Sequence, residues 1–192
     1  TDKWDSNNNA TVKDTLSQKI AVIGENLNIR RFERIKTDGV LVSYIHGGGK
    51  VGVLLELSSK SISDKINELG KNICMQIAAM SPKFVSRDDV SEDFISKEKE
   101  ILTQQTMNEG KPENIAKKIV EGRLNKELKE FCLIDQEYVK DNNMTVGQYI
   151  DSVSKEIGEN ISVIKFVRFE TGEGLEKKEE NFAEEVSKAM KN

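Results

Sequence analysis

Apolar side chains recur every three or four positions in two early segments of the chain, which is the spacing of one helical face. The first segment, 11–23, is followed by Gly24, a residue that commonly ends helices. Its apolar positions are Val12, Leu16, Ile20 and Ile23. The second segment, 61–80, is closed by Ser81-Pro82, since the residue before a proline disfavours helix. Its apolar positions are Ile62, Ile66, Leu69, Ile73, Ile77 and Met80. We expect a helix over each segment.

Three stretches between these helices have the pattern of β-strands. Residues 51–57 show the clearest alternation, because every second position is valine or leucine. Residues 40–45 and the more basic stretch 28–35 are expected to form two further strands. The glycine-rich link 46–50 predicts a hairpin with a longer loop. The helix over 61–80 would then cover one face of this sheet.

The middle of the chain is more charged and predicts two paired helices. Ser86 with Asp89 has the pattern of a capping box, which would open a helix over 90–108. Gly110 would end that helix, and Pro112 would start a second one in its tolerated first turn. Both helices have a thin apolar seam and charged outer faces. This arrangement is typical of a projecting antiparallel helical hairpin.

The last third predicts a helix, a strand and a terminal helix. Thr145 with Gln148 is a second capping box, which would open a short helix. Residues 160–170 have the pattern of a strand that could return to the sheet, followed by a break at two glycines. Residues 178–191 predict an amphipathic helix whose apolar side includes Phe182 and Val186.

The expected fold class is therefore α+β. An antiparallel sheet of three to four strands would be covered by helices, with a projecting coiled-coil hairpin and a C-terminal helix. The expected organisation is a flexible lead-in, a core subdomain, the hairpin, a core return of helix and strand, and a C-terminal helical module. Their ranges are 1–10, 11–87, 88–131, 132–175 and 176–192. Because the chain does not begin with Met, we expect a fragment or a processed piece.

Composition narrows the class of protein. The 192 residues have a formal net charge of −4 and an isoelectric point near 5.3. Nucleic-acid-binding domains usually have an isoelectric point above about 9, so a general nucleic-acid-binding protein is not expected. No run approaches the ~18 apolar residues of a membrane span, so we expect a soluble protein. Cys74 and Cys132 can form at most one disulfide. Without a signal peptide they are expected to be reduced thiols in a cytoplasmic protein.

Motifs that would support catalysis or cofactor binding lack their structural context. Gly47, Gly49 and Gly52 match the dinucleotide fingerprint, but that motif needs a following helix and a strand is expected here. His46-Gly47-Gly48-Gly49 resembles an esterase oxyanion motif, yet the chain has no Gly-x-Ser-x-Gly elbow. A single histidine and two distant cysteines do not form a metal-ligand set. We expect neither a cofactor nor an enzyme.

The remaining candidates indicate an interaction protein. Each cysteine lies on an apolar helical stripe, which favours a buried structural thiol over a nucleophile. His46 at the hairpin tip is equally compatible with a surface turn residue and with a contact residue. The basic residues within 30–36 could contact phosphates, but we favour a solvated edge of the sheet. Phe182 and Val186 must dock on this chain or on a partner.

Several stretches closely resemble bacterial elongation factor Ts. The most specific are 23–32, which begins Ile23-Gly24-Glu25-Asn26, and 44–54, which contains His46-Gly47-Gly48-Gly49. Further matching stretches are 77–82, 110–113, 120–124, 145–148 and 166–174. The resemblance extends in order from about residue 11 to the end. It implies a guanine nucleotide exchange factor that promotes GDP release from elongation factor Tu in translation elongation and binds no nucleotide itself.

The resemblance also implies which residues contact elongation factor Tu. Matching positions of the contact surface are Ile23, Gly24, His46, Gly47, Val139, Lys140, Phe182 and Val186. Lys140 stands where the family often has an apolar residue. The segment with Phe182 and Val186 resembles the module that docks on the nucleotide domain of Tu. Neither nucleic acid nor a membrane is expected as a direct partner.

Two family elements that act strongly in exchange have no match in this sequence. One is the N-terminal helical domain, and the other is a segment that inserts a phenylalanine beside the magnesium site of Tu. Thr1-Asp2-Lys3-Trp4 resembles that segment only superficially, with Lys3 in place of the phenylalanine. We therefore expect reduced exchange activity. The alternative is a self-association module, a homodimer without exchange activity.

Overall fold

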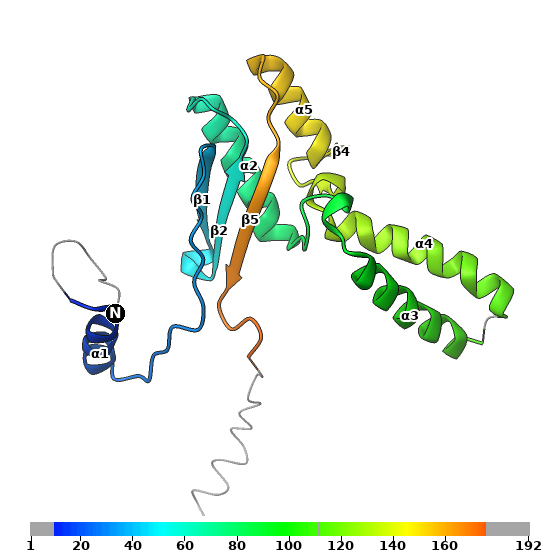
Figure 1. Ribbon diagram of the computed structural model, residues 1–192, viewed down its shortest axis with the longest axis horizontal. Coiled ribbons are helices and arrows are strands. Elements are labelled where there is room, and N and C mark those ends of the chain that lie inside the picture. Colours follow the sequence, from blue (N-terminus) through cyan, green and yellow to red (C-terminus); the bar gives the residue numbers. More distant parts are fainter. Residues whose placement is uncertain (1–9, 111, 176–192) are drawn as a thin grey trace, which may run out of the picture. The chain divides into compact units, whose positions relative to one another are not determined.

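The computed structural model describes residues 10–110 and 112–175 (Figure 1). It divides the chain into two compact units, Thr1–Lys36 and Thr37–Asn192. Within the described residues the structure is mixed helix and strand, which confirms the predicted α+β class. The lead-in before residue 10 and the expected helix 178–191, with Phe182 and Val186, lie outside the described residues.

The described part of the first unit consists of helix α1, Val12–Ile23, and an irregular segment. Thr11 caps α1, since its hydroxyl accepts the Asp14 N–H at 3.1 Å and the Asp14 carboxylate accepts the Thr11 N–H. Gly24 ends α1, as predicted. The predicted strand 28–35 is wrong, because this segment forms neither strand nor helix. Its apolar residues recur every third position, whereas one face of a strand needs every second. They are Ile29, Phe32 and Ile35.

The second unit is built on a three-stranded antiparallel sheet. Its strands are β1 (Val40–His46), β2 (Val51–Leu57) and β5 (Val163–Glu170), in the order β1-β2-β5. Strands β1 and β2 form the predicted hairpin, and β5 returns to pair along β2 as the pattern of 160–170 predicted. The central strand β2 is therefore hydrogen-bonded on both sides. The sheet has three strands, at the lower limit of the predicted three to four.

Helix α2, Asp64–Met80, packs across β1 and β2 and covers one face of the sheet (Figure 1). Ser63 caps it by accepting the Ile66 N–H, so α2 begins three residues later than predicted. Ile62 is consequently outside the helix and 79% exposed. The core between sheet and helix is aliphatic. It includes Val42, Val53, Leu55, Leu57, Ile66, Leu69, Ile73 and Ile77.

Helices α3 (Glu92–Asn108) and α4 (Glu113–Phe131) form the predicted helical hairpin (Figure 1). The Ser86–Asp89 capping box is present but opens a short 3₁₀ turn, Arg87–Asp89, and Ser91 caps α3 instead. Pro112 is the N-terminal cap of α4 rather than a residue of its first turn. Both helices contribute a few buried side chains to the seam. These side chains are Leu102, Thr106, Ala116, Val120, Leu124 and Leu128.

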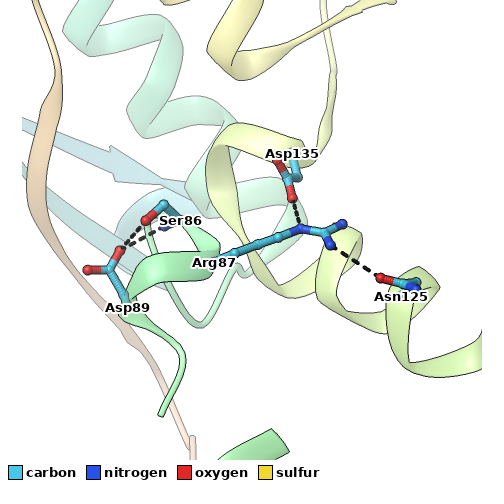
Figure 2. Close-up of polar contacts among 5 residues, drawn as sticks. All are labelled: Ser86, Arg87, Asp89, Asn125 and Asp135. Carbon is cyan, nitrogen blue, oxygen red and sulfur yellow. Dashed lines mark hydrogen bonds and ion pairs between the residues drawn. The ribbon is translucent and has the colours of Figure 1, made fainter. Parts of the chain in front are cut away.

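Arg87 ties the base of the hairpin to the segment that follows it (Figure 2). Its Nε donates to the Asp135 carboxylate at 2.6 Å, and its Nη1 donates to the Asn125 side chain on α4 at 3.3 Å. In addition, the ammonium of Lys83 lies 3.6 Å from the centre of the ring of Phe131, the last residue of α4, in a cation–π contact. The root of the hairpin is thus fixed by both polar and aromatic contacts.

The chain after α4 contains a small ladder that the sequence did not indicate. Strands β3 (Glu137–Tyr138) and β4 (Asp141–Thr145) pair antiparallel and lead into helix α5, Val146–Ile157. The predicted Thr145–Gln148 capping box is present at the start of α5. Val146 and Ile150 on α5 are buried in the same core as α2. The ladder was missed because β3 is only two residues long and has no alternation to detect.

Both cysteines are buried free thiols, as predicted. Burial raises the pKa of Cys74 to about 12 and also raises the pKa of Cys132. Each thiol is therefore protonated, and hence a poor nucleophile, near neutral pH. Along the described stretches of the chain, no helix is long and apolar enough to cross a membrane.

Candidate partner-binding site

The predicted contact pair Ile23 and Gly24 forms the C-terminal end of α1, in the first unit. Ile23 is 53% exposed, although an isoleucine side chain is normally buried. Gly24 has φ +78°, a left-handed conformation in which its N–H donates to the carbonyl of Ile20 at 2.9 Å. The place where a Cβ of Gly24 would stand is open space. This helix end therefore offers a partner an exposed apolar side chain beside bare backbone.

The second predicted pair, His46 and Gly47, lies at the tip of the β1–β2 hairpin. Three successive glycines with φ of +59°, +67° and +96° form a short turn there, which other residues adopt only with strain. His46 is exposed, and its Nδ1 is within hydrogen-bond distance of the Tyr44 hydroxyl at 2.9 Å. Tyr44 thus orients the imidazole. After Lys50 the chain continues as strand β2, as predicted, and not as the helix that a dinucleotide fingerprint needs.

The third predicted pair, Val139 and Lys140, forms the turn between β3 and β4. Val139 is 48% exposed, while its N–H donates inward to the Gln76 side chain at 2.8 Å. The Lys140 ammonium donates to the side-chain oxygen of Asn72 at 2.6 Å. Both acceptors belong to α2. This turn is consequently anchored on the helix that also supports the sheet.

The structure distributes the predicted contact residues over three separate loops or helix ends. His46, Gly47, Val139 and Lys140 belong to the second unit, and Ile23 and Gly24 to the first. Phe182 and Val186 lie outside the described residues. Within residues 10–110 and 112–175, no group of three or more His, Cys, Asp or Glu side chains could hold a metal ion. The exposed apolar groups and oriented polar groups are suited to binding another protein.

Sequence reasoning missed the side chains that support the Val139–Lys140 turn. Asn72 and Gln76 are buried polar residues on α2, one helical turn apart. Tyr149 accepts a hydrogen bond from Asn72 at 2.7 Å and stacks on Tyr138, with ring centres 4.3 Å apart. Burial also raises the pKa of Tyr138. No usable signal for them was present in the sequence, because the hydrophobic pattern assigns polar side chains to the solvated face of a helix.

Comparison with known proteins gives the family of this chain. The sequence model of the family described as Elongation factor TS matches residues 1–173. The chain belongs to the elongation factor Ts family. An elongation factor Ts of Clostridioides difficile (strain 630) is 53% identical over 181 residues, which cover 94% of this chain and 60% of the relative. The elongation factor Ts of Clostridium novyi (strain NT) is 52% identical over 189 residues, covering 98% of this chain and 62% of the relative.

Further elongation factor Ts relatives agree with these two. That of Clostridium perfringens (strain SM101 / Type A) is 52% identical over 179 residues, 93% of this chain and 59% of its own length. The chain thus spans about 60% of the length of the curated elongation factor Ts proteins it matches. The resemblance seen in the sequence motifs is confirmed as family membership.

Proposed function

We propose that this chain binds elongation factor Tu and promotes release of its GDP by protein–protein contact. The observation that carries the proposal is the match to the elongation factor Ts family model over residues 1–173. The exposed His46 tip and the Val139–Lys140 turn support it, since both present side chains that are oriented by intramolecular hydrogen bonds. The chain acts in this proposal as a translation elongation factor that is not an enzyme and needs no cofactor.

The proposed exchange is a coupling between two binding equilibria on Tu. If the chain weakens GDP binding to Tu by some factor, GDP weakens binding of the chain by the same factor. The chain therefore needs only to bind the nucleotide-free form of Tu more tightly than the GDP-bound form. Contacts at Ile23–Gly24, His46–Gly47 and Val139–Lys140 would supply that difference, with Phe182 and Val186 as a further proposed contact.

Titrating the chain into elongation factor Tu loaded with a fluorescent GDP analogue is expected to accelerate release of the nucleotide. The rate should rise with chain concentration and saturate, because release follows formation of a complex. Stopped-flow fluorescence measures it, and His46→Ala is expected to lower the rate at subsaturating concentration. Nucleotide release that is independent of chain concentration, alongside an active elongation factor Ts of Clostridioides difficile, would contradict the proposal.

We also propose that these 192 residues exchange GDP more slowly than a full-length relative. The basis is the matched length, since the chain spans about 60% of the relatives and so offers less contact surface by itself. The same titration decides this point when both proteins are compared at equal concentration. Equal maximal rates would show that the contacts of this chain suffice.

Self-association is a second candidate function, favoured by the sheet face that points away from α2. Leu41 and Ile45 of β1 lie on this face, and Ile45 is 72% exposed. Leu54 and Val167 form a cross-strand pair on the same face. Covering such aliphatic side chains in a homodimer would remove them from water. Sedimentation at several concentrations is expected to show a dimer if this candidate holds, and a monomer at every concentration would exclude it.

A further inference from the structure

The turn between β3 and β4 is exposed at its tip but is supported from beneath by two buried amides. We propose that Asn72 and Gln76 of α2 are positioning residues that hold the Val139–Lys140 turn in the conformation that docks on a protein partner. This inference rests on the proposed function, in which that turn contacts elongation factor Tu. It adds the residues that shape the contact and the chemical character of the surface they produce.

Gln76 fixes the backbone on both sides of Tyr138. Its side-chain oxygen accepts the Val139 N–H at 2.8 Å, and its nitrogen donates to the Glu137 carbonyl at 3.1 Å. The same nitrogen donates to the side-chain oxygen of Gln136, also at 3.1 Å. Gln76 is fully buried, and Gln136 donates in turn to the carbonyl of Glu130 at 2.6 Å. These partners allow only one orientation of the Gln76 amide, because its oxygen and nitrogen each face a complementary group.

Asn72 fixes the other half of the turn. Its oxygen accepts the Lys140 ammonium at 2.6 Å, and its nitrogen donates to the Tyr149 hydroxyl at 2.7 Å. Asn72 is 7% exposed, so this contact is partly buried, and it is strengthened by the charge on the donor. Tyr149 stacks on Tyr138, the residue between the two backbone groups held by Gln76. Both amides thus act on the same few residues.

The Asn72 contact decides what the turn presents to a partner. The Lys140 ammonium is hydrogen-bonded to Asn72 of α2, while the side chain of the neighbouring Val139 is 48% exposed. In this proposal the turn therefore presents the apolar side chain of Val139 to a partner, rather than the Lys140 ammonium. Because the turn is already ordered, binding does not incur the entropy cost of ordering it.

Replacing Asn72 or Gln76 by leucine is expected to weaken binding to Tu by about threefold to tenfold, the effect of having to order one or two side chains on binding. Asn72→Asp keeps an acceptor for Lys140, so it is expected to restore most of the affinity. Lys140→Met removes the donor of the hydrogen bond to Asn72, so it is expected to weaken binding by a similar factor without changing the dependence of binding on salt. A matched control is Ser59→Ala, which removes a buried hydroxyl that is hydrogen-bonded to Ser61 and Glu159 and not to the turn.

Two measurements on the full chain test the proposal separately from the proposed function. Amide hydrogen exchange of Val139 in the free chain is expected to accelerate at least tenfold in Gln76→Leu, but not in Ser59→Ala, while β2 amides stay protected. Affinity for Tu is measured by titration at low and high salt. Unchanged exchange at Val139 would overturn the positioning role.

Faster amide hydrogen exchange at Val139 with unaltered affinity for Tu would overturn the docking role of the turn. A salt dependence of binding that disappears in Lys140→Met would show that the Lys140 ammonium contacts the partner, and would overturn its placement on Asn72. If the unaltered chain fails to bind Tu, the proposed function fails. The hydrogen-exchange data then still decide whether the side chains of Asn72 and Gln76 position the turn.

Discussion

Replacing Gly70 by valine is expected to lower the free energy of unfolding by about 3 kcal/mol or more, at the upper end of the range for forcing extra carbon into a packed interior. Gly70 is buried in α2 where the helix crosses β1. A Cβ on Gly70 would stand 2.5 Å from Cγ2 of Val42 and 3.0 Å from its Cβ. Because Val42 is β-branched and itself buried, it has little freedom to move aside.

Urea unfolding followed by circular dichroism measures this effect, and Gly122→Val is the matched control. Gly122 also lies inside a helix, α4, but nothing lies within 4 Å of the place its Cβ would take. Its replacement should change stability by no more than about 0.5 kcal/mol, the difference in helix propensity. Adding Val42→Ala to Gly70→Val should recover part of the loss through the space it opens. Equal stability of Gly70→Val and the unaltered protein would contradict the close approach of α2 to β1.

The free energy of unfolding is expected to fall as the pH rises from about 9 to about 12, because the Cys74 thiol ionises more readily in the unfolded chain than in the folded protein. Burial raises the pKa of this thiol from its ordinary value of 9.0 to about 12. Below pH 9 the thiol is neutral in both states, so its contribution to stability is complete. Between the two values only the unfolded chain releases the proton. Unfolding is then favoured by up to about 1.4 kcal/mol for each pH unit.

The contribution of Cys74 is isolated by comparing two pH series. Urea unfolding gives the free energy of unfolding of the unaltered protein and of Cys74→Ala at each pH. Above pH 9 this free energy should fall less steeply with pH in the variant. Other groups that titrate in this range affect both proteins equally and cancel in the comparison. Parallel slopes would mean that the thiol is hydrated in the folded protein. The buried position of Cys74, where its thiol faces the Val42 carbonyl at 3.6 Å, argues against that outcome.

The sequence predicted elements with a regular pattern and missed those defined by contacts distant in the chain. Helix α2 and strand β2 were recognised because a single buried face imposes a strict period on their residues. The predicted strand 28–35 failed because its basic, β-compatible residues have no period-2 apolar face and find no partner strand. The capping box at Ser86 was correctly recognised, but it opens a short turn because Val90 is extended.

The candidate site was less accessible to sequence reasoning than the fold. His46 could be placed at an exposed tip, since the glycines after it exclude regular structure. Asn72 and Gln76 have polar side chains, which a periodicity argument assigns to the solvated face of a helix. Their burial depends on Val139 and Tyr149, more than sixty residues away, whose groups satisfy them. Local patterns do not contain that information.

The pairing of β5 with β2 has a consequence for the order of folding. The two strands are separated by ~100 residues, so closing the sheet carries a large loop-closure cost. The α3–α4 hairpin lies within that loop and depends mainly on contacts between its own neighbouring helices. During synthesis the hairpin can therefore form while β2 still has a free edge. A chain stalled before β5 would expose that edge, and with it a template for pairing with another nascent chain.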